Sequence, residues 1–140
     1  MIRLVSISAF RIALEALLKV KRGVYAGVTM EICKVFQGVS IEQIRANRDM
    51  ILMDNDSLII KLRLPDKKQQ LSKADGYRLV YMVMKNVPLV VLLSIYPKRG
   101  SMQKLTLNPN ELESLLNDFR IEFENKQIVI HDINTLNKLI

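Results

Sequence analysis

Residue types that often build catalytic or metal sites are scarce in this 140-residue chain. It contains one cysteine, Cys33, one histidine, His131, and no tryptophan. A single cysteine excludes an intramolecular disulfide and argues against a cysteine-based zinc site. It also favours a reducing, intracellular setting. Nothing in the sequence supports a catalytic Cys33–His131 pair, so we expect a buried, inert Cys33 and a surface or strand-edge His131.

Glycine and proline are few, with five and four residues, and there is no repeat, linker or low-complexity tract. The longest uninterrupted apolar run, Val87–Leu93, is far shorter than the ~20 residues of a spanning helix. The apolar N-terminus is interrupted by Ser6, Ser8 and Arg11, which argues against a signal peptide. No glycine-rich phosphate loop, metal-ligand cluster or calcium loop occurs. We therefore expect no cofactor, no metal and no membrane association.

Positive charge is concentrated in the middle of the chain. The formal net charge is +7, and residues 61–104 hold ten Lys or Arg against two Asp or Glu. Residues 105–140 reverse the balance, with three basic and six acidic residues. Such asymmetry is typical of a polyanion-binding protein, although solvated lysines alone would also produce it.

The pattern of apolar residues predicts one domain of class α+β. Helical spacing is found between residues 10 and 38, a capping box opens a short helix at residue 40, and residues 108–111 form a strong helix start. Two-residue alternation or apolar runs predict strands at residues 2–7, 58–64, 77–84 and 89–96. The last of these is apolar on both faces and should be central. Residues 128–140 are read as a strand and a short helix. We expect the N-terminal helices and the C-terminal helix to pack on one face of a small, mainly antiparallel sheet.

Basic residues lie on or beside the predicted strands. Lys61 and Arg63 share the cationic face of one strand, Arg78 lies one residue inside the next, and Lys98 and Arg99 follow the third. Hairpin pairing brings such strand ends together, and arginine is suited to gripping phosphate with two donors. Three tyrosines could stack on bases or pack in the core: Tyr77, Tyr81 and Tyr96.

Three segments in this order resemble the core of the RelE/HigB-type toxins of bacterial type II toxin–antitoxin systems. They read I-I-K-L-R-L-P at 59–65, S-K-A-D-G-Y-R-L-V-Y at 72–81 and L-S-I-Y-P-K-R at 93–99. The spacing fits throughout residues 58–116, and the helical N-terminal part fits in kind. We expect residues 1–124 to form the RelE-like domain and residues 125–140 an extension of unknown role.

The resemblance implies a small microbial-RNase-like fold and a cytoplasmic endoribonuclease. Its substrate would be mRNA in the A site of the 30S subunit, cleaved by attack of a ribose 2′-OH on the adjacent phosphate, and a cognate antitoxin would neutralise it. Residue by residue, the resemblance implies catalytic roles for Lys61, Arg78, Lys98 and Arg99. It implies RNA contacts for Arg63, Lys73, Tyr96 and Lys104. Cations alone suit this chemistry, because the RNA supplies its own nucleophile.

The sequence departs from the family pattern at two places. Asp75 stands where the family often has glycine, and it can pair with Lys73 or Arg78. Residues 100–108 lack the tyrosine that some members carry after the basic loop. A toxin-like module that binds RNA or antitoxin with weakened catalysis therefore remains the alternative. A gyrase-poisoning relative is disfavoured, because such relatives generally lack the cation set.

Overall fold

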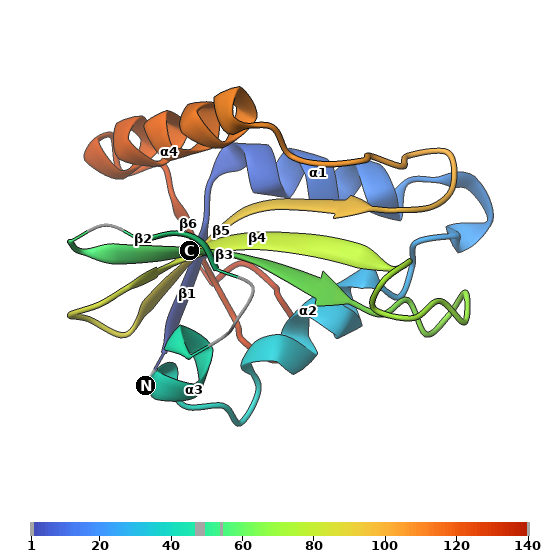
Figure 1. The fold of residues 1–140 in the computed structure, drawn as a ribbon, viewed down its shortest axis with the longest axis horizontal. Coiled ribbons are helices and arrows are strands. Elements are labelled where there is room, and N and C mark those ends of the chain that lie inside the picture. The colour runs from blue at the N-terminus through green and yellow to red at the C-terminus, as the bar shows by residue number, and fades with distance from the viewer. Residues whose placement is uncertain (1, 47–49, 54, 140) are drawn as a thin grey trace.

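The computed structural model describes residues 2–46, 50–53 and 55–139 of the chain, which form an α+β fold. One strand and a series of helices come first, four consecutive strands follow, and a longer helix and a short strand end the chain (Figure 1). The elements are β1 (Arg3–Ser6), α1 (Ser8–Leu18), η1 (Lys21–Gly23), α2 (Val28–Phe36), α3 (Ile41–Arg45), β2 (Met50–Met53), β3 (Ser57–Leu64), β4 (Tyr77–Met84), β5 (Leu89–Pro97), α4 (Pro109–Glu124) and β6 (Val129–His131).

The strands form one sheet in the order β2-β3-β4-β5-β1-β6. Strands β2 to β5 pair antiparallel in chain order. The first strand, β1, lies parallel to β5, and β6 forms the far edge of the sheet, antiparallel to β1. The mainly antiparallel sheet is therefore confirmed. Strand β5 is central and almost wholly buried, as its apolar sequence predicts.

Helices cover both faces of the sheet, so the prediction of helices on one face is wrong. Figure 1 shows α1 and α4 on one side and α2 and α3 on the other. The rings of Tyr77 and Tyr81 meet Tyr25 and Phe36 edge-on, which places α2 over that face. Both strand tyrosines are fully buried, so they pack in the core and base stacking by them is excluded.

Local sequence signals account for where two helices begin. At the start of α3 the Ser40 hydroxyl accepts a hydrogen bond from the backbone N–H of Gln43. The Gln43 side chain in turn accepts one from the backbone N–H of Ser40. The Asn108 side chain and Glu111 form the same reciprocal cap at α4, with Pro109 at the first helical position. Such caps satisfy backbone donors that a helix N-terminus leaves unpaired.

The C-terminal segment is part of the same sheet. Its strand β6 pairs with β1, and the side chain of His131 on β6 is buried. Its Nε2 lies 2.6 Å from the Ser6 hydroxyl and its Nδ1 2.9 Å from the carbonyl oxygen of Leu136. His131 thus lies on an edge strand as expected, but it is not a surface residue.

Three smaller expectations can also be compared with the structure. The strand predicted within residues 128–140 is present, whereas residues 132–139 contain a turn and an isolated bridge in place of a helix. Strand β2 was not predicted. Cys33 is buried, as expected. No helix among the described residues is long and apolar enough to cross a membrane.

Candidate RNA-cleaving site

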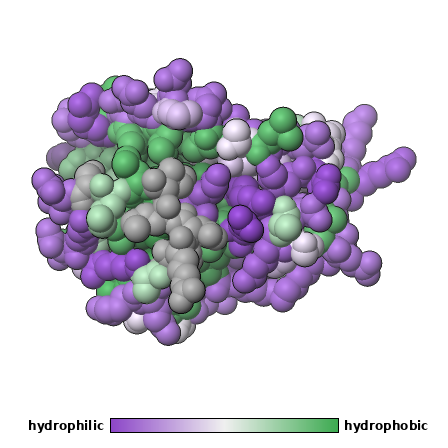
Figure 2. Space-filling model, in the orientation of Figure 1, coloured by the Kyte–Doolittle hydropathy of each residue, from purple (hydrophilic) through white to green (hydrophobic). Residues whose placement is uncertain are grey.

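The predicted cations of β3 and β4 share the sheet face that α1 and α4 partly cover. In the strand register Lys61 lies opposite Val80, and Arg63 opposite Arg78. Arg78 in turn lies opposite Tyr96 of β5. Since alternate residues of a strand point to the same face, these side chains project together at one end of the sheet. Hydrophilic side chains gather on that end of the molecule, toward the right in Figure 2, beside a hydrophobic area under α4.

Arg78 is half-buried where the chain enters β4, and its guanidinium is hydrogen-bonded there. It donates to the carbonyl oxygens of Lys73 and Ala74, both at 2.9 Å, and to that of Tyr77 at 3.1 Å. These bonds fix the arginine against the 72–76 turn.

Gly76 explains how the turn reaches the strand so closely. A Cβ at this position would lie 2.1 Å from the Leu64 carbonyl oxygen, a backbone atom that cannot move aside. Arg78 is therefore placed next to β3 by a backbone approach that only glycine permits.

The loop after β5 brings two further cations to the same end. Lys98 is half-buried, and its ammonium donates to the carbonyl oxygen of Leu105. Arg99 is exposed and forms an ion pair with Asp75, with 2.6 Å between Nη2 and Oδ1. The Asp75 carboxylate thus pairs with Arg99, which was not among the partners expected for it, Lys73 or Arg78.

Lys98 is the cation whose protonation the site perturbs. Partial burial, followed by the positive fields of Arg78, Lys61 and Arg99, lowers the pKa of Lys98 below its usual value. The positive charges of these neighbours disfavour the protonated form of Lys98. A lysine with a lowered pKa exchanges protons more readily near neutral pH.

Tyr96 lies at the base of the site, not at its surface. Its side chain is only 5% exposed, so in this arrangement its ring has no open face for a base. Burial raises the pKa of Tyr96, while Arg78 and a hydrogen bond with the backbone of Leu107 lower it. The hydroxyl therefore stays protonated and links the strand to the basic loop.

Lys73 and Lys104 differ in how freely their charges could contact a phosphate. Lys73 is exposed on the turn whose carbonyl groups bind Arg78. Lys104 forms an ion pair with Glu111 at the start of α4, so much of its charge is compensated. Arg63 is exposed at the end of β3. The set of eight predicted residues thus divides into a converging group, Lys61, Arg78, Lys98 and Arg99, and a surrounding group, Arg63, Lys73, Tyr96 and Lys104.

The sequence did not point to Tyr25, which holds the basic loop from the other face of the sheet. Its hydroxyl donates to the Arg99 carbonyl oxygen at 2.9 Å and accepts from the Met102 backbone N–H at 3.2 Å. Gly100 lies against it with φ at +91°, and a Cβ there would be 2.3 Å from the hydroxyl oxygen. No pattern in the sequence links positions 25 and 100, because the contact is made only by tertiary packing.

Within the described residues, no group of three or more His, Cys, Asp or Glu side chains could hold a metal ion. No protein-family model, curated protein or solved structure matches this chain.

Proposed function

We propose that this protein is the toxin of a type II toxin–antitoxin system, a cytoplasmic endoribonuclease that cleaves mRNA in the ribosomal A site. The observation that carries the proposal is the convergence of Lys61, Arg78 and Lys98 at one end of an otherwise apolar sheet. The resemblance of residues 58–116 to RelE/HigB-type toxins agrees with it in the order and spacing of the same residues.

The proposed chemistry uses the RNA as its own nucleophile. A ribose 2′-oxygen bonds to the adjacent phosphorus, the bond to the 5′-oxygen of the next nucleotide breaks, and a 2′,3′-cyclic phosphate and a 5′-hydroxyl result. One proton leaves the 2′-hydroxyl and one reaches the departing oxygen, so the overall step is proton-neutral. The enzyme must align the reacting groups and stabilise the additional negative charge on the phosphate.

Each converging cation has a role in this step. Arg78, held by three carbonyl groups, is oriented to stabilise the developing charge. Lys98 is the candidate for proton transfer, because its pKa is lowered and it lies among other cations. Lys61 holds the phosphate from β3, while Arg63 and Lys73 extend the positive surface along the RNA backbone. Electrostatic contacts of this kind bind RNA without reading its sequence.

The Asp75–Arg99 ion pair favours the second candidate, a toxin-like module with weakened catalysis. Arg99 is engaged by a carboxylate at 2.6 Å in the absence of RNA. A phosphate must compete with Asp75 before it can bind this arginine. The module would still bind RNA or a cognate antitoxin through the remaining cations.

Expression in bacterial cells separates the two candidates. For a nuclease, induction of the wild-type chain arrests growth and translation, and Arg78→Ala abolishes both effects. Removal of one charge-stabilising donor typically lowers the rate by about 10²–10³-fold. Arg120→Ala is the matched control, because Arg120 is an exposed arginine of α4 whose side chain donates a hydrogen bond to Asn117.

Unchanged growth with an intact, folded wild-type chain would overturn the nuclease proposal. Arrest that persists in Arg78→Ala would also contradict the assignment of this residue. Co-expression with a neighbouring helix-turn-helix protein that relieves the arrest would support the antitoxin partner.

A further inference from the structure

The segment between β5 and α4 carries the carbonyl group that binds Lys98. The Lys98 ammonium donates to the Leu105 carbonyl oxygen, and the backbone of Leu107 is hydrogen-bonded to Tyr96. Backbone groups of residues 104–108 therefore hold two residues of the candidate site. An ammonium has three donors, so the bond to Leu105 leaves two for a phosphate and sets their direction. The position of this segment thus determines where Lys98 points.

Polar contacts, more than apolar packing, hold this segment in place. Leu105 is 80% exposed and Thr106 beside it is exposed as well, so the middle of the segment gains little from burial. At its start, the Lys104 backbone N–H donates to the Pro97 carbonyl oxygen at 3.0 Å. At its far end, Leu107 packs against the core. Contacts at the two ends therefore decide where the Leu105 carbonyl group lies.

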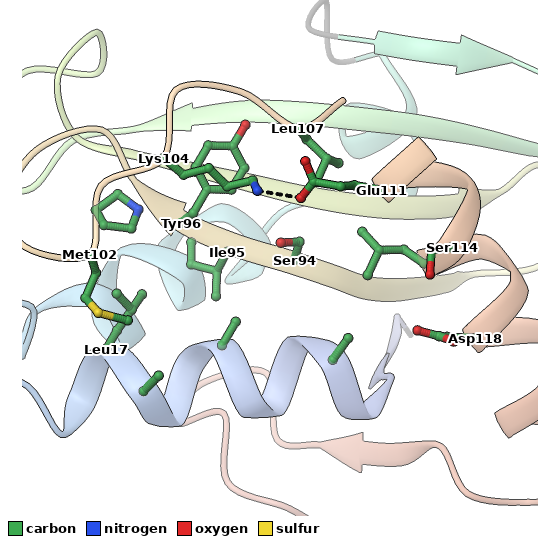
Figure 3. A pocket seen from close by; sticks show the side chains of 15 residues that line it. Leu17, Ser94, Ile95, Tyr96, Met102, Lys104, Leu107, Glu111, Ser114 and Asp118 are labelled. Atoms are coloured by element: carbon green, nitrogen blue, oxygen red, sulfur yellow. Dashed lines mark hydrogen bonds and ion pairs between the residues drawn. The ribbon is translucent and has the colours of Figure 1, made fainter. Parts of the chain in front are cut away.

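Glu111 joins the two ends of this segment through its two carboxylate oxygens. Its Oε1 accepts from the Asn108 backbone N–H at 3.3 Å, as part of the cap of α4. Its Oε2 accepts from the Lys104 ammonium. Figure 3 shows the Lys104 side chain reaching Glu111 beside Tyr96 and Leu107. The bonds from Lys104 and then Asn108 lower the pKa of Glu111, so this carboxylate is ionised at neutral pH.

We propose that Glu111 is a positioning residue that directs the Lys98 ammonium through residues 104–108. This inference rests on the proposed function, which gives Lys98 its part in proton transfer. An ionised carboxylate repels phosphate, so Glu111 acts through the segment and not on the RNA. Lys104, for which the resemblance implies an RNA contact, becomes the other half of the bridge that fixes the segment.

Glu111→Gln separates the positioning role from the helix cap. Glutamine at the third helical position keeps the reciprocal cap with Asn108, whereas its neutral amide loses the ion pair with Lys104. Because the pair is partly exposed, the midpoint of thermal unfolding should be nearly unchanged. In ribosome-dependent mRNA cleavage, kcat should fall by about 10–10²-fold, the cost of misplacing a reacting group by about 1 Å. KM should change little, because the cations of β3 remain.

A double-mutant cycle with Lys104→Met tests whether the two residues act together. If Lys104 acts through Glu111, the double variant loses no more activity than either single variant. If Lys104 contacts RNA by itself, Lys104→Met raises KM and the two losses multiply, which would overturn the proposal. Glu113→Gln is the matched control, because Glu113 is an exposed acidic residue of the same helix. It should cleave as the wild type does.

Two NMR measurements report on the segment without any cleavage. In Glu111→Gln the ε-methylene signal of Lys98 should shift, because its ammonium loses a fixed acceptor, whereas that of Lys126 beyond α4 should not. The backbone amide of Lys104, which bonds to Pro97, should exchange with solvent faster. An unmoved Lys98 signal with unchanged exchange would overturn the proposal even if kcat falls, since the loss of activity would then arise elsewhere.

Together these measurements distinguish the inference from the proposed function. If Glu111→Gln lowers kcat and moves the Lys98 signal, both stand. If the wild type cuts ribosome-bound mRNA and Glu111→Gln cuts it equally fast, the positioning role fails alone. If the Lys98 and Lys104 signals respond in Glu111→Gln but the wild type cuts no mRNA, the nuclease proposal fails alone.

Discussion

At the scale of single residues, Asp75 has the most direct control over the charge of the site. It holds Arg99 by an ion pair in which both side chains are substantially exposed. Surface pairs of this kind contribute little to stability, about 0–1 kcal/mol. The pair therefore matters for the availability of Arg99 and not for the fold.

We predict that Asp75→Asn raises RNA-cleaving activity several-fold and leaves the midpoint of thermal unfolding nearly unchanged. The substitution removes the carboxylate that competes with phosphate for Arg99, which strengthens phosphate binding. Initial rates of RNA cleavage measure the first effect and circular dichroism the second.

Glu15→Gln is the control for this prediction. It breaks another exposed ion pair, between Glu15 and Lys19 on α1, at a site away from the cations. Activity should be unchanged by it. A fall in activity in Asp75→Asn would show instead that the carboxylate positions Arg99 productively.

The sequence predicted where the cations lie but not how each is engaged. Alternation along β3 placed Lys61 and Arg63 on one face, and hairpin pairing set Arg78 beside them. The partner of Asp75 and the burial of Tyr96 depend on how loops fold over the strand ends. Those contacts join residues far apart in the chain, so local patterns do not encode them.

At the scale of elements, the loop after β5 is held by a contact from the opposite side of the sheet. The Tyr25 hydroxyl bridges the Arg99 carbonyl group and the Met102 N–H, and Gly100 makes room for it. The positions of Lys98 and Arg99 therefore depend on packing between this loop and the segment that joins η1 to α2.

We predict that Gly100→Ala destabilises the protein and lowers its activity together. The added Cβ meets the Tyr25 hydroxyl, and φ at +91° is unfavourable for alanine. Urea unfolding should show that Gly100→Ala lowers the free energy of unfolding by more than Gly38→Ala does. Gly38 also has positive φ, at +63°, but a Cβ there meets nothing within 4 Å.

Gly38→Ala thus measures the backbone penalty alone, about 1–2 kcal/mol. Tyr25→Phe removes the bridging hydroxyl without adding bulk and should lower activity with a smaller loss of stability. Equal stability of the two alanine variants, with activity intact in Gly100→Ala, would contradict a positioning role for this contact.

Element types were largely predictable, whereas their arrangement was not. Capping residues marked the starts of α3 and α4, and alternation marked β3. The parallel pairing of β1 with β5 joins distant segments, and the face that a helix covers is decided by that topology. For this reason the helices on two faces were not foreseen.

At the scale of the whole molecule, the two ends of the chain are joined by a buried polar network. His131 of β6 bonds to Ser6 of β1, and Arg11 of α1 donates to the same Ser6 hydroxyl at 3.1 Å. Glu122 of α4 accepts from the Ser8 backbone N–H and hydroxyl, both at 2.8 Å. The C-terminal segment is thereby fixed to the edge of the sheet.

We predict that the protein loses stability as the pH falls from 7.5 to 5.5. Burial lowers the pKa of His131 below its ordinary value of 6.5. The folded chain then binds fewer protons than the unfolded chain in this window, so acidification favours unfolding. Urea unfolding between pH 7.5 and 5.5 measures how the free energy of unfolding changes with pH.

His131 is the only histidine, so His131→Gln should remove most of this dependence. Carboxylates contribute mainly at lower pH, because their ordinary pKa values are near 4. An unchanged slope in the variant would contradict a neutral, buried His131. Activity measured at pH 7.5 separates this structural role from any part in cleavage.

The most direct test of the central claim is the chemistry of the mRNA ends. Ribosomes programmed with a defined mRNA are incubated with the purified wild-type chain, Arg78→Ala and Arg120→Ala. The account predicts A-site cleavage that leaves a 2′,3′-cyclic phosphate and a 5′-hydroxyl, lost in Arg78→Ala and kept in Arg120→Ala. Intact mRNA with the folded wild type, or ends bearing a 3′-hydroxyl and a 5′-phosphate, would contradict it.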